Sequence, residues 1–347
     1  MRHPHLPPGA ILRIRWYAAS ASICRFNVTL LRAVTNEAPV TALRLFNGHS
    51  MVGKLGCVLV CSPRSAGWNQ PERAARWREL GFHHPPDFNT AQAQHEQMCR
   101  QLAVAGAEIW ESPPALDLSL DAVYAHDALL PTDFGFIIMR PGKPNRVSEG
   151  KHQSSFCKRL GHPISISFLS ANADSFTPTK ILPPGTTEAG DMVWLDEKTL
   201  LIGRGYRTNN AGIAQIRDLL SPRAVQVLSA PLPYGSGPSA CLHLMSLISL
   251  LDERTALVDL PWLAVETVEL LKARGYHLLE IDYSERETLA CNVLSLGERR
   301  LLALEENRKT NQKLRDTGFH VSTFPGSELC INGNGGPTCL TRPLQRS

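Results

Sequence analysis

The sequence predicts an α/β protein made of five copies of one supersecondary unit, arranged as a ring or an array. Two observations support this prediction. An order of strand, hairpin, helix and returning strand recurs along the chain, and polar residues interrupt the first strand of several units at equivalent places. Such units cannot bury their apolar faces alone, and radial closure would leave a central channel into which the strand ends point. We therefore expect the polar residues to converge there.

The repeats begin near residues 121, 188, 241 and 289, and an opening unit from Lys54 brings the number to five. In the opening unit we expect a buried strand over 56–61, a helix capped by Asn89 or Thr90 that runs to about Ala105, and a strand over 107–110. The later strands are expected over 121–127, 134–140, 188–195, 199–204, 242–251, 255–259, 291–295, 300–304 and 321–324. The later helices are expected over 210–220, 263–274 and 310–316.

The composition is that of an ordinary soluble globular protein. The chain has 347 residues, of which 43% are hydrophobic and 20% charged. Its nine cysteines are scattered without a C-x-x-C pair, which favours a reducing compartment and argues against structural zinc. We therefore expect a cytoplasmic protein.

The positive charge is concentrated in the first segment. Residues 1–48 carry a net charge of +5, which leaves −1 for the rest of a chain whose total is +4. The remainder shows no clustered basic face and no apolar stretch long enough to span a bilayer, so we expect neither a nucleic-acid nor a membrane partner. Residues 1–50 are read as an Arg-rich extension, either poorly ordered, an organellar presequence, or real structure, and 51–347 as a single domain.

The stretch 326–343 places Cys339 in a glycine-rich loop. Gly333, Gly335 and Gly336 lack a Cβ, so the backbone there can approach a ligand closely or adopt positive φ. A thiolate is reactive where charges or amide dipoles lower the pKa of the thiol, and a turn with free N–H groups is such a place. The loop therefore presents either an activated thiol or a structural cysteine buried under a hairpin.

The other candidates are polar side chains on matching points of the repeats. Taken singly, each has an ordinary explanation: a histidine in a strand can be a satisfied core residue, carboxylates can cap turns, and arginines can form surface ion pairs. Taken together with a thiol, they form a plausible set of nucleophile, acid/base and cation-binding groups. The set comprises Asp127, Arg146, Glu188, Asp191, Arg207, His243 and Cys339.

Six segments together resemble the guanidine-modifying (pentein) superfamily, and within it dimethylarginine dimethylaminohydrolase. They are Asp121–Asp127, Arg140-Pro-Gly with Arg146, Thr187–Asp191, Arg207–Asn209, Leu242–Leu244 and Gly335–Leu340. The resemblance runs from about Lys54 to the end of the chain. It implies a five-bladed α/β propeller of ββαβ units with the site in the central channel.

The resemblance also implies a role for each catalytic residue. Cys339 would be the nucleophile and His243 the general acid and base, while Glu188 and Asp127 would hold the guanidinium nitrogens. A guanidinium is a resonance-stabilised cation, so carboxylates must hold it in plane while a thiolate attacks its central carbon. His243 would protonate the departing amine and later activate water to cleave the thiouronium intermediate. Neither a metal nor another cofactor is required.

The remaining candidates would bind the rest of the substrate. By resemblance, Arg146 and Arg207 would bind an amino-acid carboxylate, and Asp121 would lie near the α-amino group. Asp191 is added as a neighbour of Glu188. His126 is also included, because it stands where the family usually has an acid, just before Asp127.

Three functions follow as alternatives. The first is a hydrolase that cleaves the guanidino C–N bond of arginine or an N-methylated arginine, giving citrulline plus ammonia or an amine. The second is an amidinotransferase, although such enzymes tend to have a histidine where this chain has Thr338. The third is a non-catalytic binding module. Arginine deiminase proper is disfavoured, because its inserted helical domain would not fit in residues 88–110. The expected partner is a small guanidine compound, and a homodimer is compatible with the resemblance.

Overall fold

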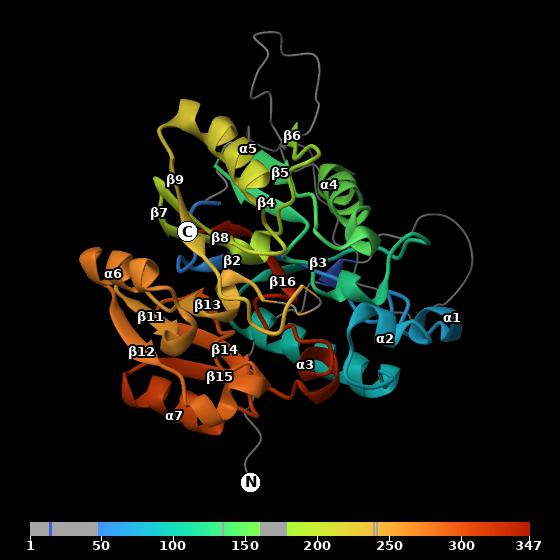
Figure 1. Ribbon diagram of the computed structural model, residues 1–347. Coiled ribbons are helices and arrows are strands. Elements are labelled where there is room, and N and C mark those ends of the chain that lie inside the picture. The colour runs from blue at the N-terminus through green and yellow to red at the C-terminus, as the bar shows by residue number, and fades with distance from the viewer. Residues whose placement is uncertain (1–13, 16–47, 134, 160–178, 239, 241) are drawn as a thin grey trace, which may run out of the picture.

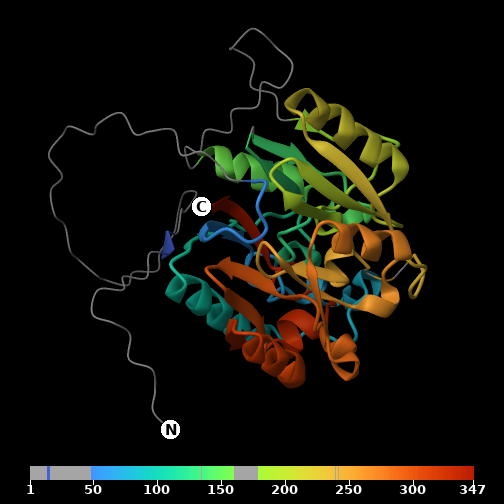
Figure 2. The ribbon, with the colours of Figure 1, turned by 90° about the vertical axis from the view of Figure 1, so that its left-hand side faces the viewer.

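The described chain is built from five β-sheets and the helices between their strands. The computed structural model describes residues 14–15, 48–133, 135–159, 179–238, 240 and 242–347. One sheet has four strands and each of the other four has three. The five predicted α/β units are thus present, and in both views α5 (Asn210–Leu220) and α7 (Arg308–Asp316) lie at the periphery of the molecule (Figure 1, Figure 2).

One unit shows the plan of all five. β7 (Met192–Asp196) pairs antiparallel with β8 (Thr199–Arg204), and the chain then returns through α5 (Asn210–Leu220) to β9 (Gln226–Pro231), which is parallel to β8. Apolar residues of α5 such as Ile216 and Leu220 pack in one cluster with Leu200 and Ile202 of β8. Burying each such side chain contributes about 1.5–3 kcal/mol, so the amphipathic helix holds its sheet from outside.

The same order recurs in three further units. The unit before it contains β4 (Leu129–Thr132), β5 (Gly135–Ile138), α4 (Glu149–Arg159) and β6 (Thr179–Lys180). The unit after it contains β10 (Ile248–Leu250), β11 (Thr255–Val258), α6 (Val265–Ala273) and β12 (His277–Glu280). The last contains β13 (Leu294–Gly297), β14 (Arg300–Leu304), α7 (Arg308–Asp316) and β15 (His320–Phe324).

The two ends of the domain build the fifth unit together. β2 (Leu55–Val60), α3 (Phe88–Val104) and β3 (Glu108–Glu111) supply its parallel part, and β16 (Thr341–Arg346) pairs antiparallel with β2. The short β1 (Ile14–Arg15) adds to β3, and the small helices α1 (Pro71–Ala74) and α2 (Trp77–Leu80) lie between β2 and α3. β16 was not predicted as a strand. Its pairing closes the ring and fixes the loop that carries Cys339.

The first strands of three units begin later than predicted. Strands were expected from residues 121, 188 and 242, whereas 3-10 turns occupy Leu120–Val123, Ala189–Asp191 and Leu244–Ser246, ahead of β4, β7 and β10. Each turn is closed by a backbone hydrogen bond between residues three apart, the pattern of a 3-10 helix. In the second turn, for example, the Asp191 amide donates to the Glu188 carbonyl oxygen at 3.0 Å. These turns hold the polar side chains at one end of the strands.

The cap predicted for α3 was also wrong, by two or three residues. The carboxylate Oδ1 of Asp87 accepts from the Thr90 amide at 2.8 Å and caps the helix, in place of Asn89 or Thr90. Pro85 and Pro86 keep the chain extended before the helix, so the helix begins directly after them and Asp87 becomes its cap. The expectations for residues 1–50 fall almost wholly outside the described residues. Within the described part, no helix combines the length and the apolar character that a membrane span requires.

Candidate active site

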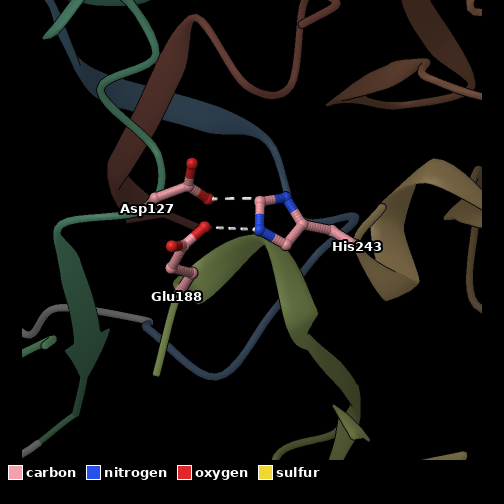
Figure 3. A group of neighbouring side chains, drawn as sticks. All are labelled: Asp127, Glu188 and His243. Atoms are coloured by element: carbon pink, nitrogen blue, oxygen red, sulfur yellow. Dashed lines mark hydrogen bonds and ion pairs between the residues drawn. The ribbon is translucent and has the colours of Figure 1, made fainter. Parts of the chain in front are cut away.

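Three of the candidate residues meet in the interior. One ligand-type atom from each of Asp127, Glu188 and His243 lies within 4.8 Å of the others, and all three side chains are buried. The two carboxylates point at the imidazole ring (Figure 3). Nε2 of His243 is 2.7 Å from Oε2 of Glu188, and Nδ1 is 3.9 Å from Oδ1 of Asp127. Two carboxylates beside an imidazole form a niche for a cation, either a guanidinium or a metal ion.

The repeat explains why these residues meet. Asp127 lies just before β4, Glu188 precedes the turn before β7, and His243 precedes the turn before β10. Gly190 allows their close approach, because a Cβ there would lie 2.6 Å from Nδ1 of His243 and 2.7 Å from Oδ1 of Asp127. The Gly190 amide instead donates to that Asp127 oxygen at 2.9 Å. The sequence prediction that these three positions converge therefore agrees with the geometry.

Arg207 and a backbone amide hold Glu188 in its charged form. Nη1 of Arg207 donates to Oε1 of Glu188 at 3.1 Å, and the Gly142 amide donates to the same oxygen at 2.9 Å. Burial by itself would raise the pKa of Glu188. The hydrogen bond with His243 and the charges of His243 and Arg207 outweigh burial and lower that pKa to about 2. Glu188 is thus an anion at neutral pH.

Arg146 holds Asp127 in the same way. Nη1 of Arg146 is 2.6 Å from Oδ2 of Asp127, and the charges of His243 and Arg146 overcome burial to keep the pKa of Asp127 well below its usual range. The other face of Arg146 bonds Glu149 through Nε at 2.9 Å and Nη2 at 2.8 Å, and Nη2 also donates to the Tyr124 carbonyl oxygen. Burial raises the pKa of Glu149 to about 7, although Arg146 opposes the shift.

Both arginines therefore bind the carboxylates of the niche in this structure. Arg146 is only 3% exposed and Arg207 4%. Their expected contact with a substrate carboxylate remains a prediction.

Cys339 lies on the loop before β16 and is connected to the residue next to Asp127. Its backbone carbonyl oxygen accepts from the His126 amide at 3.1 Å, which fixes the loop beside Asp127. Its sulfur accepts from Nδ2 of Asn292 at 3.1 Å, and Oδ1 of Asn292 accepts from the Thr338 amide at 2.9 Å. Asn292 was not among the candidates. The sequence did contain a signal for it: Asn292 interrupts the apolar first strand of the last unit, as polar residues do in the other units.

The glycines beside Cys339 serve packing. A Cβ on Gly333 or Gly335 would collide with the ring of Tyr124, and one on Gly336 would lie 2.6 Å from Cγ of Asn292. Among the residues of this loop, positive φ occurs at Asn334, with a value of 63°. The expectation that these three glycines supply positive φ was therefore wrong, and close approach accounts for them.

The remaining candidates lie around this centre. Oδ2 of Asp121 accepts from Nζ of Lys143 at 3.2 Å and from Nδ2 of Asn145 at 3.0 Å. Oδ1 of Asp191 accepts from the Leu244 amide at 3.0 Å and so anchors the turn that carries His243, and burial raises the pKa of Asp191 to about 6.

His126 points away from the niche toward the C-terminal strand. Its Nδ1 lies 2.8 Å from the Thr341 carbonyl oxygen, so that Nδ1–H donates. Burial, reinforced by the charge of Arg342, lowers the pKa of His126 to about 3, and the imidazole is neutral at neutral pH.

The fold and the thiol, imidazole and carboxylate set define a guanidine-modifying enzyme of the pentein type. The chain belongs to the arginine deiminase family: the family model described as arginine deiminase matches residues 115–277 and 263–346. The superfamily resemblance is confirmed, and so is the predicted class of enzyme, an amidine hydrolase similar to dimethylarginine dimethylaminohydrolase.

Individual relatives agree with this assignment. The N(G),N(G)-dimethylarginine dimethylaminohydrolase of Streptomyces coelicolor is 28% identical over 269 residues, which cover 75% of this chain and 88% of that protein. The dimethylarginine dimethylaminohydrolase of Pseudomonas aeruginosa, solved with citrulline, shares the fold with a TM-score of 0.64 and 23% identity over 83% of this chain and 99% of that one. The N-terminal domain of ArgZ, an arginine dihydrolase from cyanobacteria, has a TM-score of 0.67 and 19% identity over 84% and 98%. The predicted five-bladed propeller is confirmed.

Proposed function

We propose that the protein hydrolyses the guanidino C–N bond of arginine or of an N-methylated arginine, through a covalent intermediate on Cys339, to give citrulline and an amine. One observation carries this proposal. Two ionised, buried carboxylates, Asp127 and Glu188, face one imidazole, and the carbonyl oxygen of Cys339 accepts from the amide of His126, the residue before Asp127. A planar guanidinium offers several N–H donors and one positive charge, which matches two carboxylates held at fixed positions.

The first half of the reaction forms the intermediate. Asp127 and Glu188 accept hydrogen bonds from the guanidinium nitrogens and hold the plane of the group. The thiolate of Cys339 adds to the central carbon, and a C–S bond forms. The bond to the departing nitrogen then breaks, and His243 gives that nitrogen the proton with which it leaves as an amine. The thiouronium remains bound to Cys339.

The second half releases the product. His243, now neutral, takes a proton from water, and the oxygen adds to the thiouronium carbon. The C–S bond breaks, the thiolate of Cys339 is restored, and the carbon carries the ureido oxygen of citrulline. The hydrogen bond from Asn292 stabilises the sulfur whenever it is anionic, at the start and at the end of the cycle.

The relatives support the substrate class. The Streptomyces coelicolor protein is named as a dimethylarginine dimethylaminohydrolase, the Pseudomonas aeruginosa structure contains citrulline, and the cyanobacterial one is an arginine dihydrolase. All three descriptions concern an amino acid whose side chain ends in a guanidino or a ureido group. Residues 88–110 hold one long helix, α3, and this supports our preference for a dimethylarginine dimethylaminohydrolase over arginine deiminase proper.

The test is citrulline formation by the purified chain with arginine, monomethylarginine and asymmetric dimethylarginine in parallel. We expect turnover of at least one of these substrates, none by Cys339→Ser, and retained turnover by Cys99→Ser, a thiol on α3 outside the site. Citrulline production by Cys339→Ser at the wild-type rate would refute the mechanism. Product that forms only when an amine acceptor is added would instead favour the amidinotransferase alternative.

A further inference from the structure

Arg146 is held between two buried carboxylates. Its Nη1 donates to Oδ2 of Asp127 at 2.6 Å. Its Nε and Nη2 donate to Oε1 and Oε2 of Glu149 at 2.9 and 2.8 Å. The exposed fraction is 2% for Glu149 and 3% for each of the other two residues. One guanidinium thus connects a carboxylate of the niche with a carboxylate outside it.

Glu149 occupies the edge of Arg146 that is best suited to bind a carboxylate. The parallel N–H groups of Nε and Nη2 match the two oxygens of a carboxylate, and such bidentate pairs are stronger and more directional than single contacts. Because Glu149 takes this edge, Arg146 contacts Asp127 through one nitrogen, Nη1.

This arrangement leaves hydrogen-bonding capacity on Asp127. A carboxylate has about four acceptor positions. Among the residues that the structure describes, Asp127 accepts from Nη1 of Arg146 at Oδ2 and from the Gly190 amide at Oδ1. Positions therefore remain for the N–H groups of a substrate guanidinium. A bidentate contact with Arg146 would engage both oxygens and would put the arginine in competition with the substrate.

The local chain brings Glu149 and Arg146 together. Arg146 ends the 3-10 turn Pro144–Arg146, and Glu149 begins α4 three residues later. Residues three apart in a helical stretch are neighbours, so the pair forms without help from a distant segment. The Tyr124 carbonyl oxygen accepts a further hydrogen bond from Nη2 of Arg146 at 2.8 Å and holds the same edge.

Each charge of the pair stabilises the other. Burial raises the pKa of Glu149 to about 7, and the charge of Arg146 opposes that shift. Burial alone would lower the pKa of Arg146, but the charges of Glu149 and Asp127 outweigh it and keep that pKa well above its usual value. Both oxygens of Glu149 accept from nitrogen, which is the pattern of an ionised carboxylate.

We propose that Glu149 is a positioning residue: it keeps the Nε and Nη2 edge of Arg146 away from Asp127, so that Asp127 stays available to the guanidinium of the substrate. This role rests on the function proposed above. Glu149 acts through Arg146 and does not itself contact the substrate. Without its carboxylate, Arg146 would turn this edge toward Asp127 and compete with the substrate.

Glu149→Gln tests the proposal, because glutamine keeps the size of the side chain but replaces one acceptor oxygen by an NH₂ group. The Kd for methylguanidine and the KM for the substrate should rise about tenfold or more, whereas kcat should fall less than about threefold, since a saturating substrate displaces Arg146 from Asp127. Glu285→Gln is the control. It neutralises a buried glutamate that accepts from two amides of α7, and KM should not change. An unchanged KM in Glu149→Gln, or a fall in kcat alone, would overturn the proposal.

A second comparison shows whether Glu149 acts through Arg146. Lysine has no bidentate edge, so Arg146→Lys should bind methylguanidine equally weakly with and without Glu149→Gln. Methylguanidine has no carboxylate, and its affinity therefore does not report on contacts to the amino-acid end of a substrate. Losses that add in the double variant would mean that Glu149 acts by another route, and would overturn the proposal.

A crystal structure of Cys339→Ser with bound arginine decides the question even if Glu149→Gln does not fold. We expect Nε and Nη2 of Arg146 to remain on Glu149 while the ligand guanidinium contacts Asp127. Finding this edge of Arg146 on the ligand carboxylate would overturn the proposal. Wild-type protein that binds methylguanidine without forming citrulline would refute the hydrolase alone, because the affinities still decide on Glu149. Failure to bind either ligand would refute both.

Discussion

The side chain of Asn292 donates from Nδ2 to the sulfur of Cys339 at 3.1 Å and accepts at Oδ1 from the Thr338 amide at 2.9 Å. The side-chain amide of Asn292, just before β13, thus holds both Cys339 and the peptide group that precedes it. The two residues are 47 positions apart in the chain. A donor to sulfur favours the thiolate over the thiol. Asn292 is therefore a positioning residue for Cys339.

Replacing Asn292 should weaken the nucleophile. In Asn292→Ala the thiolate loses a hydrogen bond to a charged group, worth about 1.5–3 kcal/mol, so the pKa of Cys339 should rise and kcat/KM should fall roughly 10- to 100-fold at neutral pH. Asn292→Asp should raise that pKa further, since a carboxylate repels the thiolate. The pH dependence of alkylation by iodoacetamide measures the change. An unchanged alkylation midpoint in both variants would contradict this role.

The buried pair of Glu188 and Arg207 should be strongly coupled. Removing one member takes a charged partner from the other in the protein interior, so Glu188→Gln and Arg207→Met should each lower the free energy of unfolding by about 3 kcal/mol. The double variant should lose clearly less than the sum of the two. Denaturant unfolding of the four proteins gives the coupling. Additive losses would mean that the two charges do not depend on each other.

The regular parts of the repeats could be predicted because their apolar periodicity is strong. The bounds of β8 and β14, 199–204 and 300–304, and of α5, 210–220, agree with the structure. β16 was missed because Arg342 and Arg346 interrupt its apolar pattern, and nothing in a sequence marks an arginine that will be buried. The 3-10 turns were missed because a single turn held by backbone hydrogen bonds is too short to have a periodic pattern.

The three central residues of the site could be predicted from the sequence, whereas most contacts around them could not. Asp127, Glu188 and His243 could be grouped because they occupy equivalent places in repeated units. The partners of Arg146 depend on how its helix packs, and the contact of Asn292 with Cys339 joins two distant loops. Such tertiary relationships leave no periodic signal in one sequence.

Arg146 should act through the carboxylates. The guanidinium of Arg146 donates to Asp127, Glu149 and a carbonyl oxygen at once, and a single lysine ammonium cannot replace all three contacts. Arg146→Lys should therefore leave Asp127 poorly positioned and lower substrate affinity at least tenfold. The measurement is binding of arginine and of an alkylguanidine without a carboxylate, with Arg274→Lys as the surface control. Equal losses for both ligands show that Arg146 positions Asp127. A loss for arginine alone would show instead that Arg146 binds the substrate carboxylate.

His126 should make the protein less stable in acid. The folded state holds its imidazole neutral, with a pKa of about 3, whereas the unfolded value is about 6.5. As pH falls through that window, the unfolded chain takes up a proton that the folded chain does not, so stability present above pH 6.5 is progressively lost. At pH 5 the loss due to this group should be about 2 kcal/mol. His126→Asn should therefore lose less stability in acid than the wild type. His320→Asn, which alters an exposed residue of β15, should lose as much as the wild type does. Denaturant unfolding at pH 7 and pH 5 gives the comparison, and parallel declines for all three proteins would show that His126 does not carry this effect.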